Sequence, residues 1–270
     1  MNKLAFKPNF TQKSKLVNTS PDMKFANYLK QQKIYAIEKQ IVYQWKDNYW
    51  QEVEEMKLLG LALDWLNQSS PEQATARKAH ELVNTAKVEL SNKMPLSAWK
   101  EKDILAVIPL KNAYVVVKRD KVLIEKPEKE YGLTYQINSE ISGLPESEYK
   151  PLDIPKDCRF KRFLDMVLPQ QEIQNIIQEF CGMTLLPANY RIATWWTGRG
   201  ANAKSTLANL VGRFHNKTAN VRLEKLNDQF GLEHVIGASL IRVDEVPERH
   251  WDEGVFKSLV SVDGVNINRK

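Results

Sequence analysis

Cysteine, histidine and long apolar runs are the features this sequence has least of. Only two cysteines, Cys158 and Cys181, occur in 270 residues, and neither has the spacing of a metal ligand set. This favours reduced thiols and a cytoplasmic location. No apolar run approaches the ~20 residues of a membrane span, and no signal-peptide pattern opens the chain, so we expect no membrane partner. The four histidines are scattered, which indicates structural or surface roles.

Acidic residues are absent from the first 20 residues, which carry four lysines. This stretch, 1–20, is expected to be a basic flexible tail. It could follow the phosphates of DNA or simply be a solvated terminus, and both readings stay open. The whole chain has a net charge of +6, 43% hydrophobic and 27% charged residues. Such a composition is ordinary for a globular protein, and the length suits two domains.

A glycine-rich run in the last third of the chain matches a phosphate-binding loop, except that alanine stands at the second glycine position. Such a loop turns backbone N–H groups toward a triphosphate, its lysine reaches the phosphates and its hydroxyl binds Mg²⁺. A β-branched and aromatic stretch, 191–196, predicts a strand before it, and apolar spacing over 205–214 predicts a helix after it. The alternative is a turn that happens to contain Lys-Ser. The expected ATP-binding residues are Gly198, Gly200, Ala201, Asn202, Ala203, Lys204, Ser205 and Thr206.

Two adjacent carboxylates follow a second apolar stretch, 238–244, which predicts another strand. At the carboxyl end of a strand both side chains can reach one cleft. Asp244 is expected to hold Mg²⁺ together with Ser205, and Glu245 to orient and deprotonate the attacking water, with Lys204 as the other catalytic residue. The alternative is a polar strand end that enters a turn at Pro247.

The remaining patterns predict the framework around these motifs. We expect a helix from Ser20-Pro21 to about residue 32, strands over 33–53 with a turn at 46–48, and two helices up to residue 90, the second opening at Ser70-Pro71. A hairpin is expected over 113–125 and a linker over 125–157. Two amphipathic helices over 159–180 are expected to be core, with a third strand at 219–223. A short helix after residue 253 leads toward an Asp-Gly turn and the basic pair Arg269 and Lys270.

Taken together, these motifs resemble the superfamily 3 DNA helicases, specifically the phage/plasmid and poxvirus primase-helicase type. The resemblance is specific over 158–270 and weaker over 23–157. It rests on stretches in the family's order: 158–164, 178–182, the G-x-N-x-K-S-T loop at 200–206, spacers over 226–237, the acidic pair 244–245, and 256–270 as a DNA-contacting hairpin motif.

The resemblance implies an α/β fold: a partial AAA+-type phosphate-loop ATPase domain, 158–270, after a smaller α+β accessory domain, 21–124. It implies an ATP-driven helicase of phage or plasmid DNA replication with ATP and Mg²⁺ as cofactors, acting in the bacterial host cytoplasm. Implied partners are single-stranded DNA, a separately encoded or fused primase, and five further copies in a homo-hexamer when full length. DNA contacts are expected at Arg269, Lys270 and, more weakly, Lys257, which also fits a helix-surface charge.

The sequence departs from the family pattern in two ways. Ala203 replaces the glycine whose missing Cβ permits unusual φ angles. The strand with the sensor asparagine and the segment with the arginine finger have no counterpart, so we expect an incomplete ATPase domain with little ATPase activity and at most weak self-association. Two other readings stay open: a nucleotide kinase or other phosphate-loop ATPase, and an inactive module that binds DNA or partners.

Overall fold

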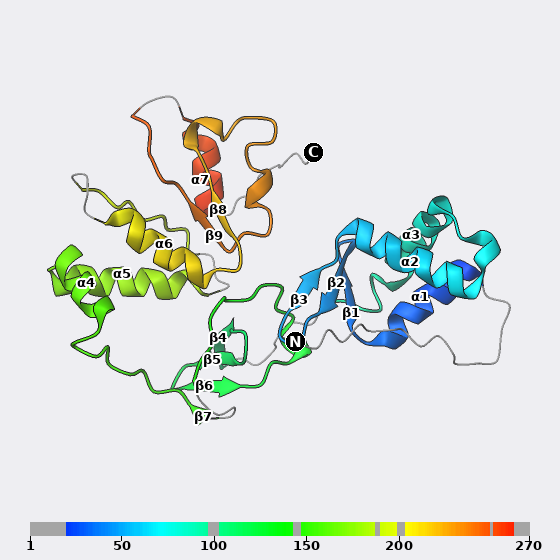
Figure 1. The fold of residues 1–270 in the computed structure, drawn as a ribbon, viewed down its shortest axis with the longest axis horizontal. Helices are drawn as coiled ribbons and strands as arrows, with labels where there is room; N and C mark the ends of the chain where they lie inside the picture. The colour runs from blue at the N-terminus through cyan, green and yellow to red at the C-terminus, as the bar shows by residue number, and fades with distance from the viewer. Residues whose placement is uncertain are drawn as a thin grey trace. The chain divides into compact units, whose positions relative to one another are not determined.

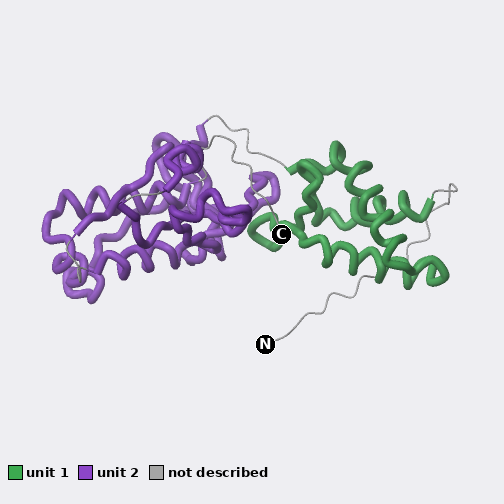
Figure 2. Tube along the Cα trace, turned by 90° about the horizontal axis from the view of Figure 1, so that it is seen from above, with its two compact units in different colours: residues 1–98 green, residues 99–270 purple. Residues whose placement is uncertain are grey.

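The chain consists of helices and several small sheets, so its fold class is mixed α/β. The computed structural model describes residues 20–96, 103–142, 147–186, 190–198, 203–248 and 251–261. These divide into two compact units, residues 1–98 and 99–270, each treated by itself below (Figure 2). Among the described residues, no helix combines the length and the apolar character that crossing a bilayer requires.

The first unit is a helical cluster with a small antiparallel sheet. Its core is formed by apolar faces of all three helices, with Phe25, Leu66 and Leu82 fully buried. The sheet has the order β1-β2-β3, and the predicted turn at 46–48 is confirmed, with the Lys46 N–H donating to the Tyr49 carbonyl at 2.9 Å. In chain order the elements are α1 (Pro21–Gln32), β1 (Tyr35–Glu38), β2 (Ile41–Trp45), β3 (Trp50–Glu52), α2 (Glu55–Ser69), a 3₁₀ turn (Pro71–Gln73) and α3 (Ala76–Leu90).

Helix starts in this unit follow the capping residues, with one correction. Ser20 caps α1 as expected, its hydroxyl accepting from the Met23 N–H at 3.4 Å. The expected start of the next helix at Ser70 is wrong. Ser70 makes no side-chain cap and Pro71 opens only a 3₁₀ turn, whereas the Thr75 hydroxyl accepts from the Lys78 N–H at 3.1 Å and α3 begins after it.

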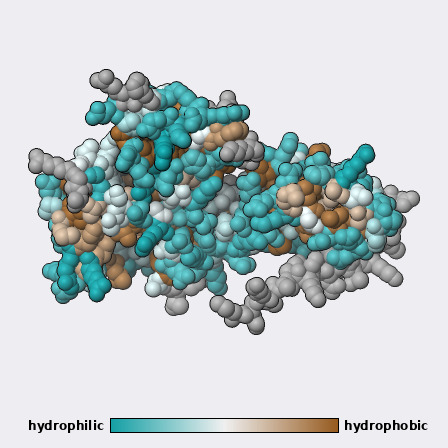
Figure 3. Space-filling view, turned by 45° about the horizontal axis from the view of Figure 1, so that its top comes forward, coloured by the Kyte–Doolittle hydropathy of each residue, from teal (hydrophilic) through white to brown (hydrophobic). Residues whose placement is uncertain are grey.

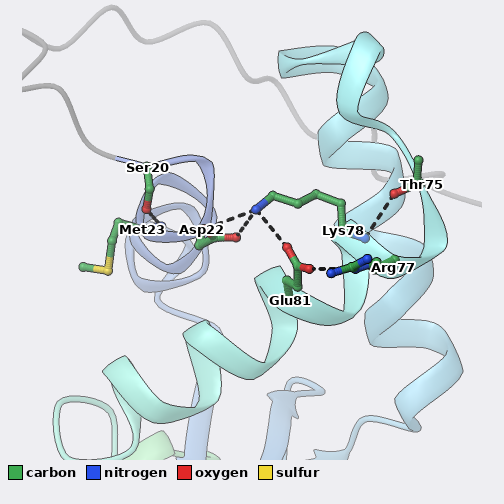
Figure 4. A network of polar contacts seen from close by, with 7 residues as sticks. All are labelled: Ser20, Asp22, Met23, Thr75, Arg77, Lys78 and Glu81. Carbon is green, nitrogen blue, oxygen red and sulfur yellow. Dashed lines mark hydrogen bonds and ion pairs between the residues drawn. The ribbon is translucent and has the colours of Figure 1, made fainter.

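A polar network joins α3 to α1 (Figure 4). The Lys78 ammonium contacts Asp22 in the first turn of α1 at 3.0 Å and Glu81 of its own helix at 3.1 Å. Arg77 contacts Glu81 from the other side at 3.3 Å. The carboxylate of Asp22 also lies where the partial positive charge of a helix start stabilises it.

The second unit begins with an antiparallel sheet of order β4-β5-β6-β7. The hairpin expected over 113–125 is confirmed as β5 and β6, while β4 lies before it. The segment expected to be a linker, 125–157, is not uniformly exposed: Leu133 and Ile137 are buried, and Ile137 forms a bridge with His215. The boundary between the two compact units falls at 98/99. The strands are β4 (Ile104–Pro109), β5 (Tyr114–Lys118), β6 (Val122–Glu125) and β7 (Ser147–Glu148).

Two helices follow, α4 (Arg159–Val167) and α5 (Gln171–Thr184), at the expected places. Their expected role as core is wrong, because none of their residues is buried. Phe160 and Ile176 are 45% and 56% exposed. Amphipathic spacing gives a helix an apolar face, but a neighbouring element must cover that face, and the described residues cover the faces of α4 and α5 only in part. Figure 3 shows hydrophobic residues at the surface as brown patches between hydrophilic ones.

The rest of the unit combines helices with a parallel pair of strands (Figure 1). β8 and β9 pair in register Thr218↔Leu240 to Asn220↔Arg242, confirming two expected strands in shorter form. The strand expected over 191–196 is wrong: residues 190–198 are described and lie outside every strand. β-Branched and aromatic residues favour a strand only where a neighbour pairs with their backbone. The elements are α6 (Lys204–Phe214), β8 (Thr218–Asn220), β9 (Leu240–Arg242) and α7 (Glu253–Ser261).

Candidate nucleotide-binding site

A cavity of about 1000 Å³ opens in the second unit between the start of α6, the segment 190–197, and β9 with the residues after it. It brings together Lys204, Ser205 and Asp244, three of the residues that the sequence predicts for ATP and Mg²⁺. Asp244 is 40 positions beyond Lys204 in the chain, so folding rather than proximity in sequence puts them around one cavity. The apolar residues that line it include Val211, Val221 and Leu240.

Lys204 is the first residue of α6, and its side chain turns back along the loop. Its Nζ donates to the Gly198 carbonyl at 3.2 Å, at the opposite end of the glycine-rich run. Ser205 and Thr206 occupy the first turn of the same helix, both exposed. The free N–H groups and partial positive charge of a helix start favour an anion there.

Ala203 is the residue before α6 and has φ 57° and ψ 19°, the left-handed conformation. Its carbonyl accepts the first helical hydrogen bond, from the Leu207 N–H at 3.0 Å, and its side chain gives no cap. An L-residue with a Cβ is disfavoured in this region by roughly 1–2 kcal/mol, whereas glycine is not. The backbone at this position therefore has the conformation that explains a glycine in the phosphate-loop pattern.

Several predicted residues lie outside the described part of the chain or outside the cavity. Gly200, Ala201 and Asn202 of the loop and the basic pair Arg269 and Lys270 are not among the described residues. Glu245 is exposed and does not line the cavity. Lys257 lies on α7, where its exposed ammonium is 3.6 Å from Glu253 one turn earlier, the pairing of a helix-surface charge.

Sequence reasoning missed Arg242, the last residue of β9. Its Nε donates to Oδ1 of Asp244 at 2.6 Å, its Nη2 contacts the same oxygen, and its Nη1 donates to Oδ1 of Asn209 on α6. The sequence signal for its contact with Asp244 is that the two residues are two positions apart, because alternate residues on a strand share a face. The contact to Asn209 could not be read from the sequence.

The donor set around the cavity fits Mg²⁺ delivered with a nucleotide. No group of three or more His, Cys, Asp or Glu converges anywhere in the described ranges. The Ser205 hydroxyl and Asp244 carboxylate are hard oxygen ligands, and Mg²⁺ bound to phosphates uses only one or two protein ligands. The indole N–H of Trp196, a residue that lines the same cavity, is buried and has no acceptor among the described residues.

His215, the residue that follows α6, joins two other elements of this unit. It is buried, and its two ring nitrogens lie 3.0 Å from the Ser239 hydroxyl and 3.1 Å from the Thr184 hydroxyl. Burial lowers the pKa of the imidazole. His215 thus connects the end of α5 to the start of β9, confirming the structural role expected for a histidine at this place.

Comparison with known proteins adds little to this geometry. A model of a protein family of unknown function, DUF5906, matches residues 196–270, a stretch that starts two residues before Gly198 and includes Asp244. No curated protein matches the chain. The match covers much less than half of the chain.

Proposed function

We propose that the chain is part of an ATP-dependent DNA helicase of the superfamily 3 type, acting in phage or plasmid DNA replication. The observation that carries the proposal is the shared cavity of Lys204, Ser205 and Asp244, with the first two at a helix start and the third just after a parallel strand. Ligands of α/β proteins bind at such strand ends, and phosphates at such helix starts.

Each residue has a defined part in the proposed chemistry. The Lys204 ammonium exchanges the Gly198 carbonyl for phosphate oxygens, since a charged acceptor binds it more strongly. Ser205 and Asp244 hold Mg²⁺, which neutralises the developing negative charge when bound. Glu245, exposed beside the cavity, is assigned the role of general base for water.

The DNA part of the proposal rests on the resemblance of 256–270 to a channel hairpin and on the net charge of +6. In the full-length protein, copies form a hexameric ring with ATP between subunits, single-stranded DNA in the centre, and a primase as partner. Arg269 and Lys270 contact backbone phosphate there, a contact independent of base sequence.

Nucleotide binding is the first test. We expect a fluorescent ATP analogue with Mg²⁺ to bind the 270-residue chain, and Lys204→Ala to weaken this binding about tenfold or more, because a hydrogen bond to a charged group contributes about 1.5–3 kcal/mol. Lys257→Ala, which removes an exposed lysine of α7, is the matched control and leaves the affinity unchanged. Equal weakening by both substitutions, or by neither, would contradict a nucleotide site at Lys204.

The second test separates the helicase from its alternatives. A helicase hydrolyses ATP faster when single-stranded DNA is added and separates a forked duplex. A nucleotide kinase transfers phosphate to a nucleotide acceptor, and its rate does not change when DNA is added. A binding module binds DNA but does not hydrolyse ATP. In the full-length protein, Lys270→Ala is expected to abolish unwinding and leave ATP binding intact. Unwinding at the normal rate in that variant would remove the hairpin assignment.

A further inference from the structure

Arg242 places a positive charge on the carboxylate that the proposed function assigns to a metal ion. Two of its nitrogens contact one oxygen of Asp244, Oδ1, with the Nε distance at 2.6 Å. The third nitrogen donates to Asn209, so the guanidinium bridges Asp244, two residues after the end of β9, and Asn209 on α6. Its side chain is only 18% exposed, against 56% for Asp244, so the arginine is held while the carboxylate faces the cavity.

This arrangement has an electrostatic consequence for any cation at Asp244. A divalent ion on the other carboxylate oxygen, Oδ2, would lie within several ångströms of the guanidinium, and the two positive charges repel. Even with the screening of bulk water, a double and a single charge about 6 Å apart repel enough to lower an affinity about tenfold. A polyphosphate in the same cavity adds negative charge, which offsets this repulsion.

We propose that Arg242 is a positioning residue that acts as an internal counter-cation, so that the site binds a divalent cation alone about tenfold more weakly than it would without this charge, and a bound polyphosphate offsets the loss. The inference rests on the proposed function in taking Asp244 as the metal ligand. Arg242 keeps Asp244 neutralised and oriented before the nucleotide arrives, and it weakens the binding of free metal ions.

The test uses Mn²⁺ alone, measured by the electron paramagnetic resonance signal of the free ion in titrations of the 270-residue chain. Arg242→Gln removes the charge but keeps an N–H donor for Asp244, and we expect it to bind Mn²⁺ about tenfold more tightly than the unchanged chain. Arg242→Lys keeps the charge and stays near the unchanged chain. Asp244→Asn added to Arg242→Gln removes the gain.

A second control separates charge from geometry. Asn209→Ala breaks the link to α6 and leaves the guanidinium charge, so it should not raise Mn²⁺ affinity. The inference is overturned if Arg242→Gln binds Mn²⁺ no more tightly, including the case in which neither protein binds it, or if Asn209→Ala tightens binding equally. Melting curves by circular dichroism show whether each variant folds. If Arg242→Gln does not fold, Arg242→Lys is used for the test: because it keeps the charge, its Mn²⁺ affinity must equal that of the unchanged chain, and a different affinity overturns the inference.

The outcome is distinguishable from failure of the proposed function. A gain of Mn²⁺ affinity in Arg242→Gln, with nucleotide binding indifferent to Lys204→Ala, supports Arg242 as the counter-cation and removes the nucleotide site. Loss of nucleotide binding in Lys204→Ala, with no gain in Arg242→Gln, supports the nucleotide site and removes the role of Arg242.

Discussion

Lys78 and Asp22, which are 56 positions apart in the chain, form an ion pair that joins α3 to α1. Their side chains are 23% and 21% exposed, and Nζ lies 3.0 Å from Oδ1. The hydrogen bond to Asp22 is the main cause that raises the pKa of the Lys78 ammonium. The pair is therefore partly shielded from water, unlike Lys57 and Glu54, whose side chains are 70% and 73% exposed.

A double-mutant cycle on this pair should give a measurable coupling energy. We expect Asp22→Asn and Lys78→Met to be coupled by about 1 kcal/mol in urea unfolding, and Glu54→Gln with Lys57→Met to be coupled by less than about 0.3 kcal/mol, since exposed pairs contribute little. Because the pKa of Lys78 is raised in the folded chain, its contribution is complete at neutral pH and is lost only as the pH rises through that raised pKa. Equal coupling in the two pairs would contradict the shielding.

Acid should destabilise the second unit through His215. Burial lowers the pKa of this imidazole, so as the pH falls below about 6.5 the unfolded chain takes up a proton before the folded chain does. The contribution of neutral His215 to the free energy of unfolding is thus complete above pH 6.5, and it is lost as the pH falls toward the lowered pKa of this imidazole in the folded chain.

His215→Gln keeps one donor and one acceptor for the two hydroxyls, those of Thr184 and Ser239, but does not titrate. The difference in unfolding free energy between the unchanged chain and this variant should shrink from pH 7 to pH 5, by about 1.4 kcal/mol for each unit of pKa lowering. Urea unfolding at pH 7 and at pH 5 measures this difference. If the unfolding free energies of the two proteins change in parallel with pH, His215 has no lowered pKa in the folded chain.

Ala203→Gly should be tolerated or stabilising, although glycine usually weakens a helix. The left-handed φ of 57° costs an alanine roughly 1–2 kcal/mol, which exceeds the entropy cost of about 0.5–1 kcal/mol for glycine. Ala208→Gly inside α6 is the matched control and should cost about 1 kcal/mol. Thermal unfolding compares the two, and a loss of stability at residue 203 as large as at residue 208 would contradict the observed backbone.

Cys181 should react slowly with alkylating agents in the folded chain. Partial burial raises the pKa of its thiol, which lowers the fraction of reactive thiolate at neutral pH. In a Cys158→Ser chain, labelling by iodoacetamide at pH 7.5 should be slow and should accelerate severalfold in urea. Labelling at the same rate in both conditions would indicate an accessible thiolate at Cys181.

Local signals in the sequence were sufficient for much of the first unit. Ser20 and Pro21 set the start of α1 because a cap and a first-turn proline act through neighbouring backbone groups alone. The start of α3 was placed too early, since Ser70 and Thr75 are both able to cap and local pattern does not say which of them has the required backbone.

In the candidate site, residue types were predictable and contacts were not. The pattern around Lys204 predicted the helix that begins there, and the apolar run before Asp244 predicted β9. The contact between Arg242 and Asn209 joins residues 33 apart, and no periodicity encodes it. Segment 191–196 has strand propensity, but pairing requires a neighbour that propensity does not supply.

The parallel pairing of β8 with β9 spans three residues in each strand, Thr218–Asn220 against Leu240–Arg242, with the connecting segment folded between them. Because the paired region is so short, its two strands are expected to separate together. The few backbone amides of the pair are protected from exchange only while the segment that connects the strands holds both in place. Amide hydrogen exchange should therefore release this pair as one cooperative unit, at a common free energy. Since Arg242 ends β9, the exchange rate of these amides would report directly on how firmly the strand end beneath Asp244 is held.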